Sequence, residues 1–256
     1  MLARIFFILL WISLFLDARP ASAKPAPVVS GVLSIVPGLG QVANGNYLEG
    51  LGYFSVSVGG ILIPNKFTQH IGLQTYLYQY YDAWRDAGGK PSQEQNWFQN
   101  YIGTYNPLNA IDWIGTPALG IVAVAEGGNR PMHSRLSESI IFGTFSGWGE
   151  EAFFRGFLFP VLSFGSNSFW MKSVGALTSS VLFSLVNKGI GTFSVIEVAQ
   201  GLLFCTQTHI NNYNLRKSMF THAWWNIIAD IKNGSRVGGV AIPDTYRLGL
   251  GYNFVF

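Results

Sequence analysis

The chain has little charge for its length. Asp, Glu, Lys and Arg together make up 11% of its 256 residues, whereas soluble proteins usually contain about 25%. Hydrophobic residues reach 49%. This balance argues against a water-soluble globular protein and predicts that lipid forms a large part of the chain's surroundings.

Cysteine and clusters of basic residues are also scarce. Cys205 stands alone in an apolar stretch, so it forms no internal disulfide and we expect a small buried hydrophobic side chain. The net charge is +3 and no basic run reaches five residues, which excludes the usual electrostatic signature of a nucleic-acid-binding protein. We therefore expect membrane lipid, and no nucleic acid, as a partner.

The N-terminus has the pattern of a targeting segment. Arg4 precedes a short apolar run from Ile5 to Leu16, and Ala21-Ser22-Ala23 forms a small-residue cleavage site. The apolar run is too short to span a bilayer well, which favours a cleaved signal peptide over a retained anchor. We expect export into the cell (inner) membrane, which the chain would cross several times.

Long stretches without charge predict an all-α, polytopic membrane helix bundle. Near the start, apolar segments 28–43 and 51–63 flank Pro37-Gly38-Leu39-Gly40-Gln41, which predicts a glycine-rich helical hairpin in or on the membrane. Beyond it, Tyr and Trp mix with charged residues, which favours an interfacial helix over about residues 71–87. From Tyr246 onwards, apolar residues alternate with other residues, so we expect a strand-like tail.

These patterns divide the chain into five segments. They are a signal peptide (1–23), a glycine-rich membrane hairpin (24–65), an aromatic interfacial helix with a linker (66–106), a helical bundle (107–236) and a strand-like tail (237–256).

The clearest candidate for chemistry is a pair of adjacent carboxylates in an otherwise apolar span. Glu150 and Glu151 are followed by Arg155, and residues four apart on a helix can form an ion pair. Glu150 lies about 100° around the helix from Glu151, so it can face a cavity while Arg155 holds its neighbour. A carboxylate in an apolar cavity suits a general base. An ion-pair network that only locks the bundle explains the pattern equally well.

Two further clusters place polar side chains on apolar helices. His222 and Asn226 are four residues apart and share a helix face, where an imidazole can accept a proton and an amide can donate to an oxyanion. Ser179 to Asn187 lines another helix with small hydroxyl groups, which packing between helices also explains. The remaining histidines, His70, His133 and His209, are expected at the interface or in loops.

Taken in order, the three clusters resemble the CPBP family, which includes the CAAX proteases and the bacteriocin-processing (Abi-type) enzymes. That family has Glu-Glu-x-x-x-Arg, Phe-x-x-x-His and His-x-x-x-Asn motifs on separate membrane helices. Asn187 occupies the histidine position of the second motif. The resemblance covers roughly residues 106–232, and the matching residues are Glu150, Glu151, Arg155, Phe183, His222 and Asn226.

The resemblance implies an intramembrane protease built around a water-filled cavity. Glu150 would activate a water for attack on a peptide carbonyl, and His222 would help to hold that water. Asn226 would stabilise the tetrahedral oxyanion, while Glu151 and Arg155 would support the site.

The resemblance also implies a zinc ion, with His222 and Glu150 as its candidate ligands. Asn187 departs from the family motif, which has a histidine at this position. An amide can orient water or an oxyanion, but it is a poor zinc ligand and takes no proton near neutral pH. His209 is a further candidate ligand from a neighbouring helix. Catalytic zinc usually has three protein ligands.

The sequence leaves three hypotheses about function. The leading one is an intramembrane endopeptidase that cleaves a membrane-associated peptide or protein. The alternative is a catalytically disarmed, CPBP-like membrane binding or scaffold protein, which Asn187 favours. A weaker hypothesis, based on the glycine-rich hairpin and the strand-like tail, is a role in transport or envelope assembly.

Overall fold

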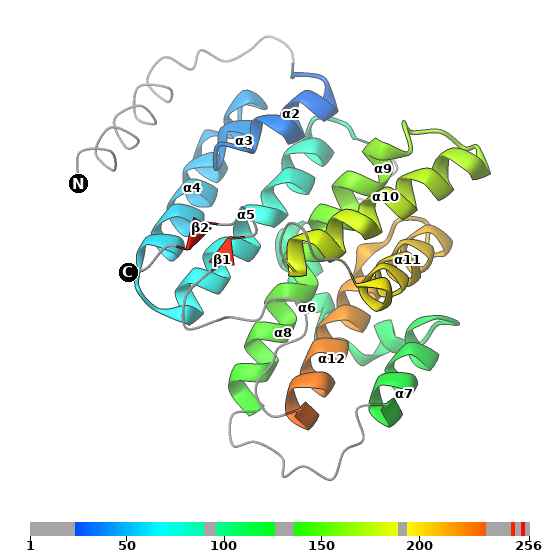
Figure 1. Cartoon of the computed structure of the whole chain (residues 1–256). Coiled ribbons are helices and arrows are strands. Elements are labelled where there is room, and N and C mark those ends of the chain that lie inside the picture. Colours follow the sequence, from blue (N-terminus) through cyan, green and yellow to red (C-terminus); the bar gives the residue numbers. More distant parts are fainter. Residues whose placement is uncertain are drawn as a thin grey trace.

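The structure is a computed structural model in which helices dominate, as predicted (Figure 1). The predicted signal peptide and His133 lie outside the residues that it describes. The described residues are 24–89, 96–125, 136–188, 194–233, 247–248 and 252–253.

The described residues form helices over most of their length. In chain order they are α2 (Pro27–Leu33), α3 (Leu39–Ala43), α4 (Tyr47–Leu62), α5 (Lys66–Asp86), α6 (Trp97–Gly103), the 3-10 helix η1 (Pro107–Ala110), α7 (Gly115–Ala125), α8 (Leu136–Glu151), the π-helix η2 (Ala152–Leu158), α9 (Phe159–Leu162), α10 (Phe169–Lys188), α11 (Val195–Ile210) and α12 (Leu215–Asn233). In the tail, β1 (Arg247–Leu248) pairs antiparallel with β2 (Tyr252–Asn253), in agreement with its predicted strand character.

The predicted glycine-rich hairpin consists of α2, α3 and α4. Gly38 begins α3 with φ 77° and Gly45 precedes α4 with φ 87°. Both values fall in the left-handed region that glycine adopts without steric cost. These two positions let the chain reverse direction twice within a short segment.

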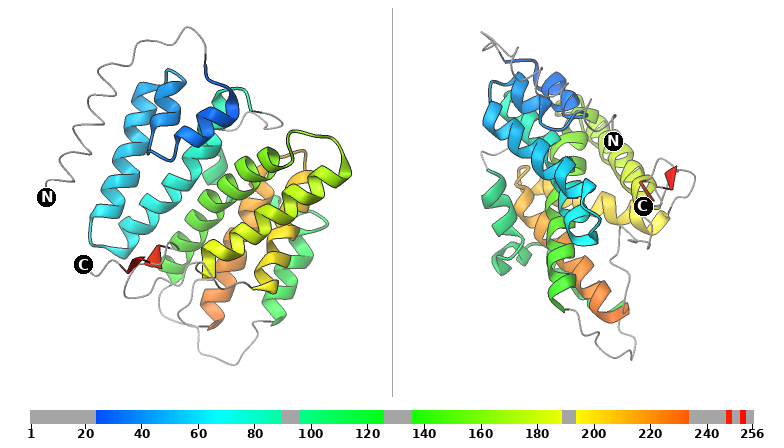
Figure 2. Two further views of the ribbon diagram at one scale, coloured as in Figure 1. Left: turned by 45° about the horizontal axis from the view of Figure 1, so that its top comes forward. Right: turned by 90° about the vertical axis from the view of Figure 1, so that its left-hand side faces the viewer.

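The helix α5 lies between the hairpin and the C-terminal bundle (Figure 2). It contacts α2, α3 and α4 on one side, and α8 and η2 on the other. Tyr78 of α5 stacks on Trp148 of α8 with ring centroids 4.2 Å apart. The sequence predicted this helix but placed it at the membrane interface, whereas in the structure its aromatic and amide side chains fill the contact between the two halves.

Small residues allow α8 and α12 to pack closely. A Cβ atom on Gly147 would lie 2.6 Å from the carbonyl oxygen of Met219, and one on Gly143 would lie 2.9 Å from that of Ala223. Close backbone contact of this kind is typical of helix pairs in membranes. The pairing is antiparallel and brings the end of α8 beside the middle of α12.

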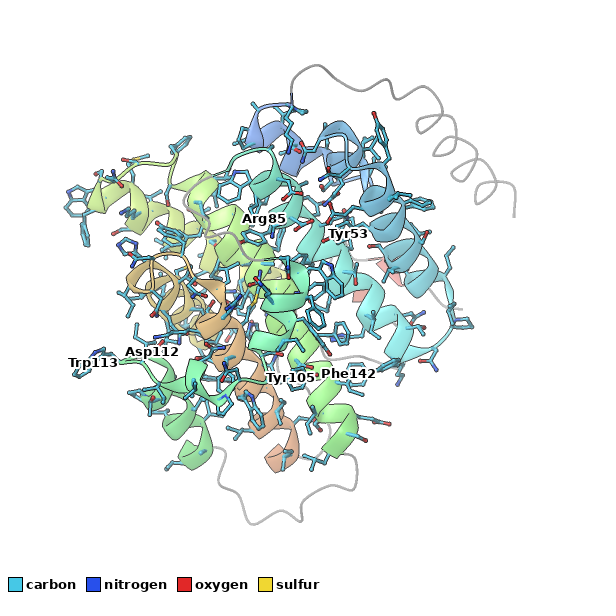
Figure 3. The ribbon with its side chains drawn as sticks, turned by 180° about the vertical axis from the view of Figure 1, so that it is seen from behind. Tyr53, Arg85, Tyr105, Asp112, Trp113 and Phe142 are labelled. Atoms are coloured by element: carbon cyan, nitrogen blue, oxygen red, sulfur yellow. The ribbon has the colours of Figure 1, made fainter. Side chains whose placement is uncertain are left out.

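Apolar side chains are prominent on the outside of the molecule, while many polar ones are inside. Trp113 is 93% exposed and projects from the periphery in Figure 3. The outer side of α10 exposes Val174, Leu177 and Val186. Among the described helices, α10 (over Phe169–Asn187) is the one whose length and composition suffice to cross a membrane. This distribution fits a protein surrounded by lipid, in which burial of apolar groups is no longer favoured.

Two adjacent glycines of α4 provide a matched test of the contact between α4 and α5. A Cβ on Gly60 would lie 2.6 Å from the carbonyl oxygen of Thr68 and 2.8 Å from Cα of Gly72, while one on Gly59 would meet no atom within 4 Å. We expect Gly60→Ala to lower the free energy of unfolding by about 1–3 kcal/mol through overpacking. Gly59→Ala should leave it unchanged or raise it by up to about 1 kcal/mol. Thermal unfolding in detergent measures both, and equal effects would contradict the close packing.

Candidate active site

The end of α8 changes from an α-helix to a π-helix where the paired carboxylates occur. Glu150 and Glu151 are the last residues of α8, and η2 follows directly. Pro160, just beyond η2, has no N–H to donate to the preceding turn, which disfavours regular α-helical hydrogen bonding there. Short π-helical segments occur frequently at functional sites.

Glu151, Arg155 and His222 form a fully buried group. Nη1 of Arg155 lies 3.0 Å from Oε1 of Glu151, and Nδ1 of His222 lies 2.8 Å from the same oxygen. All three side chains are at most 1% exposed. Because a carboxylate oxygen only accepts, Nδ1 of His222 carries the proton and donates. The contact fixes the orientation of the ring and leaves Nε2 as an acceptor in the neutral imidazole.

Aromatic rings enclose the guanidinium and the imidazole. The guanidinium carbon of Arg155 lies 4.4 Å from the ring centroid of Phe183 and 5.2 Å from that of Phe204. Phe204 also stacks on His222 with centroids 5.0 Å apart. Phe183, predicted as a supporting residue, therefore lies at the site, and contacts of this kind stabilise a buried cation.

Glu150 faces His222 from the other side. Its Oε2 lies 3.7 Å from Nε2 of His222, and its Oε1 accepts a hydrogen bond of 3.2 Å from Nε2 of Gln74 on α5. Glu150 is 2% exposed. At 3.7 Å the two atoms are too far apart for a direct hydrogen bond, but a single water molecule can reach both.

Two amides complete the set of predicted residues. Asn226 lies one turn after His222 and is 2% exposed. Asn187 lies one turn after Phe183 on α10. The Nδ2 atoms of both amides are buried and have no hydrogen-bond partner among the described residues. The predicted residues thus include a carboxylate, an imidazole and two N–H donors without a partner in the described part of the chain. Groups of these kinds suit general base catalysis and the binding of an oxyanion.

Two polar residues near the site were missed by the sequence analysis. Gln74 contacts Glu150 directly. His70, expected at the interface, is 1% exposed, and its Nε2 lies 3.1 Å from the carbonyl oxygen of Phe142 and 3.4 Å from Oγ of Ser146. Both residues lie on α5, four residues apart, and this spacing on one helix face was the only sequence signal that could have marked them. His209, in contrast, lies at the exposed end of α11, away from the predicted ligands.

The donor set at Glu150 and His222 does not fit zinc. These two residues supply two ligands, Oε2 of Glu150 and Nε2 of His222. Within the described part of the chain, no group of three metal-ligating side chains converges there. Catalytic zinc usually has three protein ligands, and the amide of Asn187 is a poor substitute.

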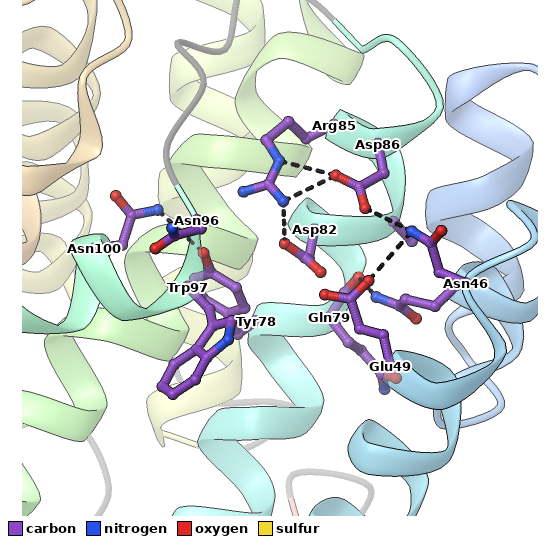
Figure 4. Close-up of polar contacts among 12 residues, drawn as sticks. Asn46, Glu49, Tyr78, Gln79, Asp82, Arg85, Asp86, Asn96, Trp97 and Asn100 are labelled. Carbon is purple, nitrogen blue, oxygen red and sulfur yellow. Dashed lines mark hydrogen bonds and ion pairs between the residues drawn. The ribbon is translucent and has the colours of Figure 1, made fainter.

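A second polar cluster joins the hairpin to α5 (Figure 4). Oxygens of Glu49, Asp82 and Asp86 lie within 4.8 Å of one another. Arg85 pairs with Asp82 at 2.6 Å and with Asp86 at 2.8 Å, and Asn46 donates to Glu49 and Asp86. The cation and the amide offset the repulsion among the carboxylates, so the cluster fixes the start of α4 against the end of α5.

The comparisons with known proteins support the resemblance found in the sequence. Residues 133–228 match the family model described as type II CAAX prenyl endopeptidase Rce1-like. This segment contains all seven residues predicted for the site. No curated protein and no solved structure matches the chain.

The buried ion pair makes a prediction about stability. Replacing Arg155 by Met would leave the Glu151 charge buried without a cation, so we expect the free energy of unfolding to fall by about 3–5 kcal/mol. The double variant Glu151→Gln/Arg155→Met removes both charges. Its free energy of unfolding should fall by much less than the sum of the losses in the single variants Glu151→Gln and Arg155→Met. Chemical denaturation in detergent measures this coupling, and additive losses would show that the pair is not coupled.

The incomplete ligand set makes a prediction about zinc. We expect purified wild-type protein to carry no stoichiometric zinc, whereas Asn187→His, which adds a third candidate ligand, should bind about one ion. Elemental analysis after dialysis measures the zinc content. Asn65→His, on the exposed N-terminal cap of α5, controls for adventitious binding. Stoichiometric zinc in the wild type would show that the ligands present without a histidine at position 187 suffice to hold the ion.

Proposed function

We propose that this chain is an intramembrane endopeptidase of the CPBP family, because residues 133–228 match the Rce1-like model of type II CAAX prenyl endopeptidases. It hydrolyses a peptide bond of a membrane-associated peptide or protein. The observation that carries the proposal is the buried pair of Glu150 and His222, whose Oε2 and Nε2 atoms lie 3.7 Å apart. A water between them has both an acceptor for its proton and a second acceptor that orients it.

In the proposed reaction, Glu150 acts first as base and then as acid. Its carboxylate removes a proton from the water while the water oxygen attacks the peptide carbonyl carbon. The negative charge that develops on the carbonyl oxygen is stabilised by the N–H groups of Asn226 and Asn187. The C–N bond then breaks, and Glu150 returns the proton to the leaving amine.

His222 and its partners keep the water in position. The Nδ1–H group donates to Glu151, so the lone pair on Nε2 is directed away from that carboxylate and accepts a hydrogen bond from the water. Arg155 balances the charge of Glu151. A carboxylate that fixes the tautomer and orientation of an imidazole plays the same part in other hydrolases.

The surroundings of the site determine the kind of substrate. The exposed apolar side chains of α10 and α7 favour a substrate that reaches the site from the lipid rather than from water. We propose a multi-pass location in the inner membrane, reached through the predicted signal peptide, with membrane lipid as the immediate neighbour. Zinc plays no part in the proposed step.

Asn187 favours a second candidate function. An amide in the histidine position removes a group that could take up a proton, which would suit a relative that binds membrane-associated proteins without cutting them. In that case Glu151, Arg155 and His222 serve only to stabilise the bundle.

A cleavage assay separates the two functions. Purified protein in detergent is incubated with a library of membrane peptides, and products are identified by mass spectrometry. We expect cleavage by the wild type, and at least a 100-fold loss in Glu150→Gln, because the amide cannot take the proton from water. Glu138→Gln, in the exposed first turn of the same helix, is the matched control and should retain activity.

The variant Asn187→His decides the outcome if the wild type is inactive. Activity that appears only in this variant would identify the wild type as a disarmed binding protein. Cleavage that persists in Glu150→Gln would contradict the proposed role of Glu150.

A further inference from the structure

The helix α5 lies outside the matched segment 133–228, yet it touches the site. A Cβ atom on Gly149 would lie 2.5 Å from both the backbone oxygen and the side-chain Oε1 of Gln74. Gly149 immediately precedes Glu150. The absence of a side chain at this position is therefore what allows Gln74 to reach the carboxylate.

Gln74 contacts one specific oxygen of Glu150. Its Nε2 donates to Oε1 over 3.2 Å, while Oε2 of Glu150 is buried without a hydrogen-bond partner among the described residues and lies 3.7 Å from Nε2 of His222. Gln74 is fully buried. The two oxygens of the carboxylate therefore have different surroundings, and the one that faces the imidazole is free.

The chemical nature of the donor suits a base. A carboxylate without a fixed partner can rotate about its last bond, and each rotation moves the oxygen that must meet the water. A neutral amide restrains this rotation, and it stabilises the negative charge less strongly than a cationic donor would. The carboxylate is thus held in place but remains able to accept a proton.

The polar character of α5 continues for one more turn. His70 precedes Gln74 by four residues and meets Ser146, which precedes Glu150 by four residues on α8. The Nδ1 atom of His70 is buried without a partner among the described residues. The side of α5 that packs on α8 therefore carries an imidazole and an amide beside the candidate base, where tight packing alone would favour apolar residues.

We propose that Gln74, supplied by α5 from outside the family segment, is a positioning residue of the active site that holds Oε1 of Glu150 and directs Oε2 toward the attacking water. The inference rests on the proposed function. It matters more in this chain than in one with a histidine at position 187, because Asn187 offers no imidazole to orient the water.

The first test compares the kinetics of Gln74→Met and wild type. Met is close in size to Gln but cannot donate, so we expect kcat to fall about 10- to 100-fold with little change in KM. The matched control is Gln69→Leu on the same helix, whose amide donates to the backbone of Ile61 and not to α8. If Glu150→Gln is inactive but Gln74→Met has the kcat of the wild type, the role of Gln74 is overturned and the proposed function stays intact.

A second variant changes the contact without altering either side chain. Gly149→Ala places a methyl group against Gln74 and should lower kcat in the same way as Gln74→Met. Gly120→Ala, whose Cβ would meet no atom within 4 Å, is its control and should retain wild-type kcat. Full activity in folded Gly149→Ala protein would also count against the inference.

Infrared spectroscopy tests whether Gln74 holds the carboxylate of Glu150 even if no peptide in the library is cleaved. The infrared difference between wild type and Glu150→Gln isolates the carboxyl band of Glu150. We expect this band to shift in Gln74→Met and to remain unchanged in Gln69→Leu. An unshifted band in Gln74→Met would show that the amide does not hold Glu150, whatever the activity of the protein.

Discussion

The buried charge of Arg155 is the constraint on which the rest of the site depends. A guanidinium that is shielded from solvent is strongly unfavourable unless an anion balances it and polarisable groups surround it. Here Glu151 supplies the anion, and Phe183 and Phe204 supply the rings. The same carboxylate oxygen also holds His222. The packing of η2, α10, α11 and α12 around one cation thereby fixes the position of this imidazole.

Glycine residues at the helix contacts allow the backbones around the site to pack closely. Gly143 and Gly147 bring α12 against α8, and Gly149 brings α5 against the next turn. Each glycine removes the side chain that would hold two backbones apart, and in lipid this close packing replaces the hydrophobic effect as a source of helix association. Helices held at this distance also bring polar side chains of different helices within reach of one another, as with Gln74 and Glu150.

Local spacing explains what the sequence could predict. The residues Glu151 and Arg155, and likewise His222 and Asn226, are four apart, so a helix alone places each pair on one face. The helical class also follows from local periodicity and is confirmed, and the described residues of the tail form a short antiparallel pairing. The position of α5, in contrast, does not follow from local periodicity. Its Tyr and Trp residues are typical of a membrane interface, and nothing in their spacing indicates that Tyr78 would instead stack on Trp148.

The candidate site is therefore built from two parts of the chain, and only one of them carries motifs that the sequence reveals. The family segment carries the carboxylates, the imidazole and the amides in short motifs. The helix α5 contributes Gln74 through a single long-range contact that depends on Gly149. Asn187 shows why such a contribution has value. In the reaction proposed above, Asn187 offers no imidazole to orient the water, so the orientation of Glu150 matters more. A neutral donor from a neighbouring helix restrains this carboxylate without cancelling its charge.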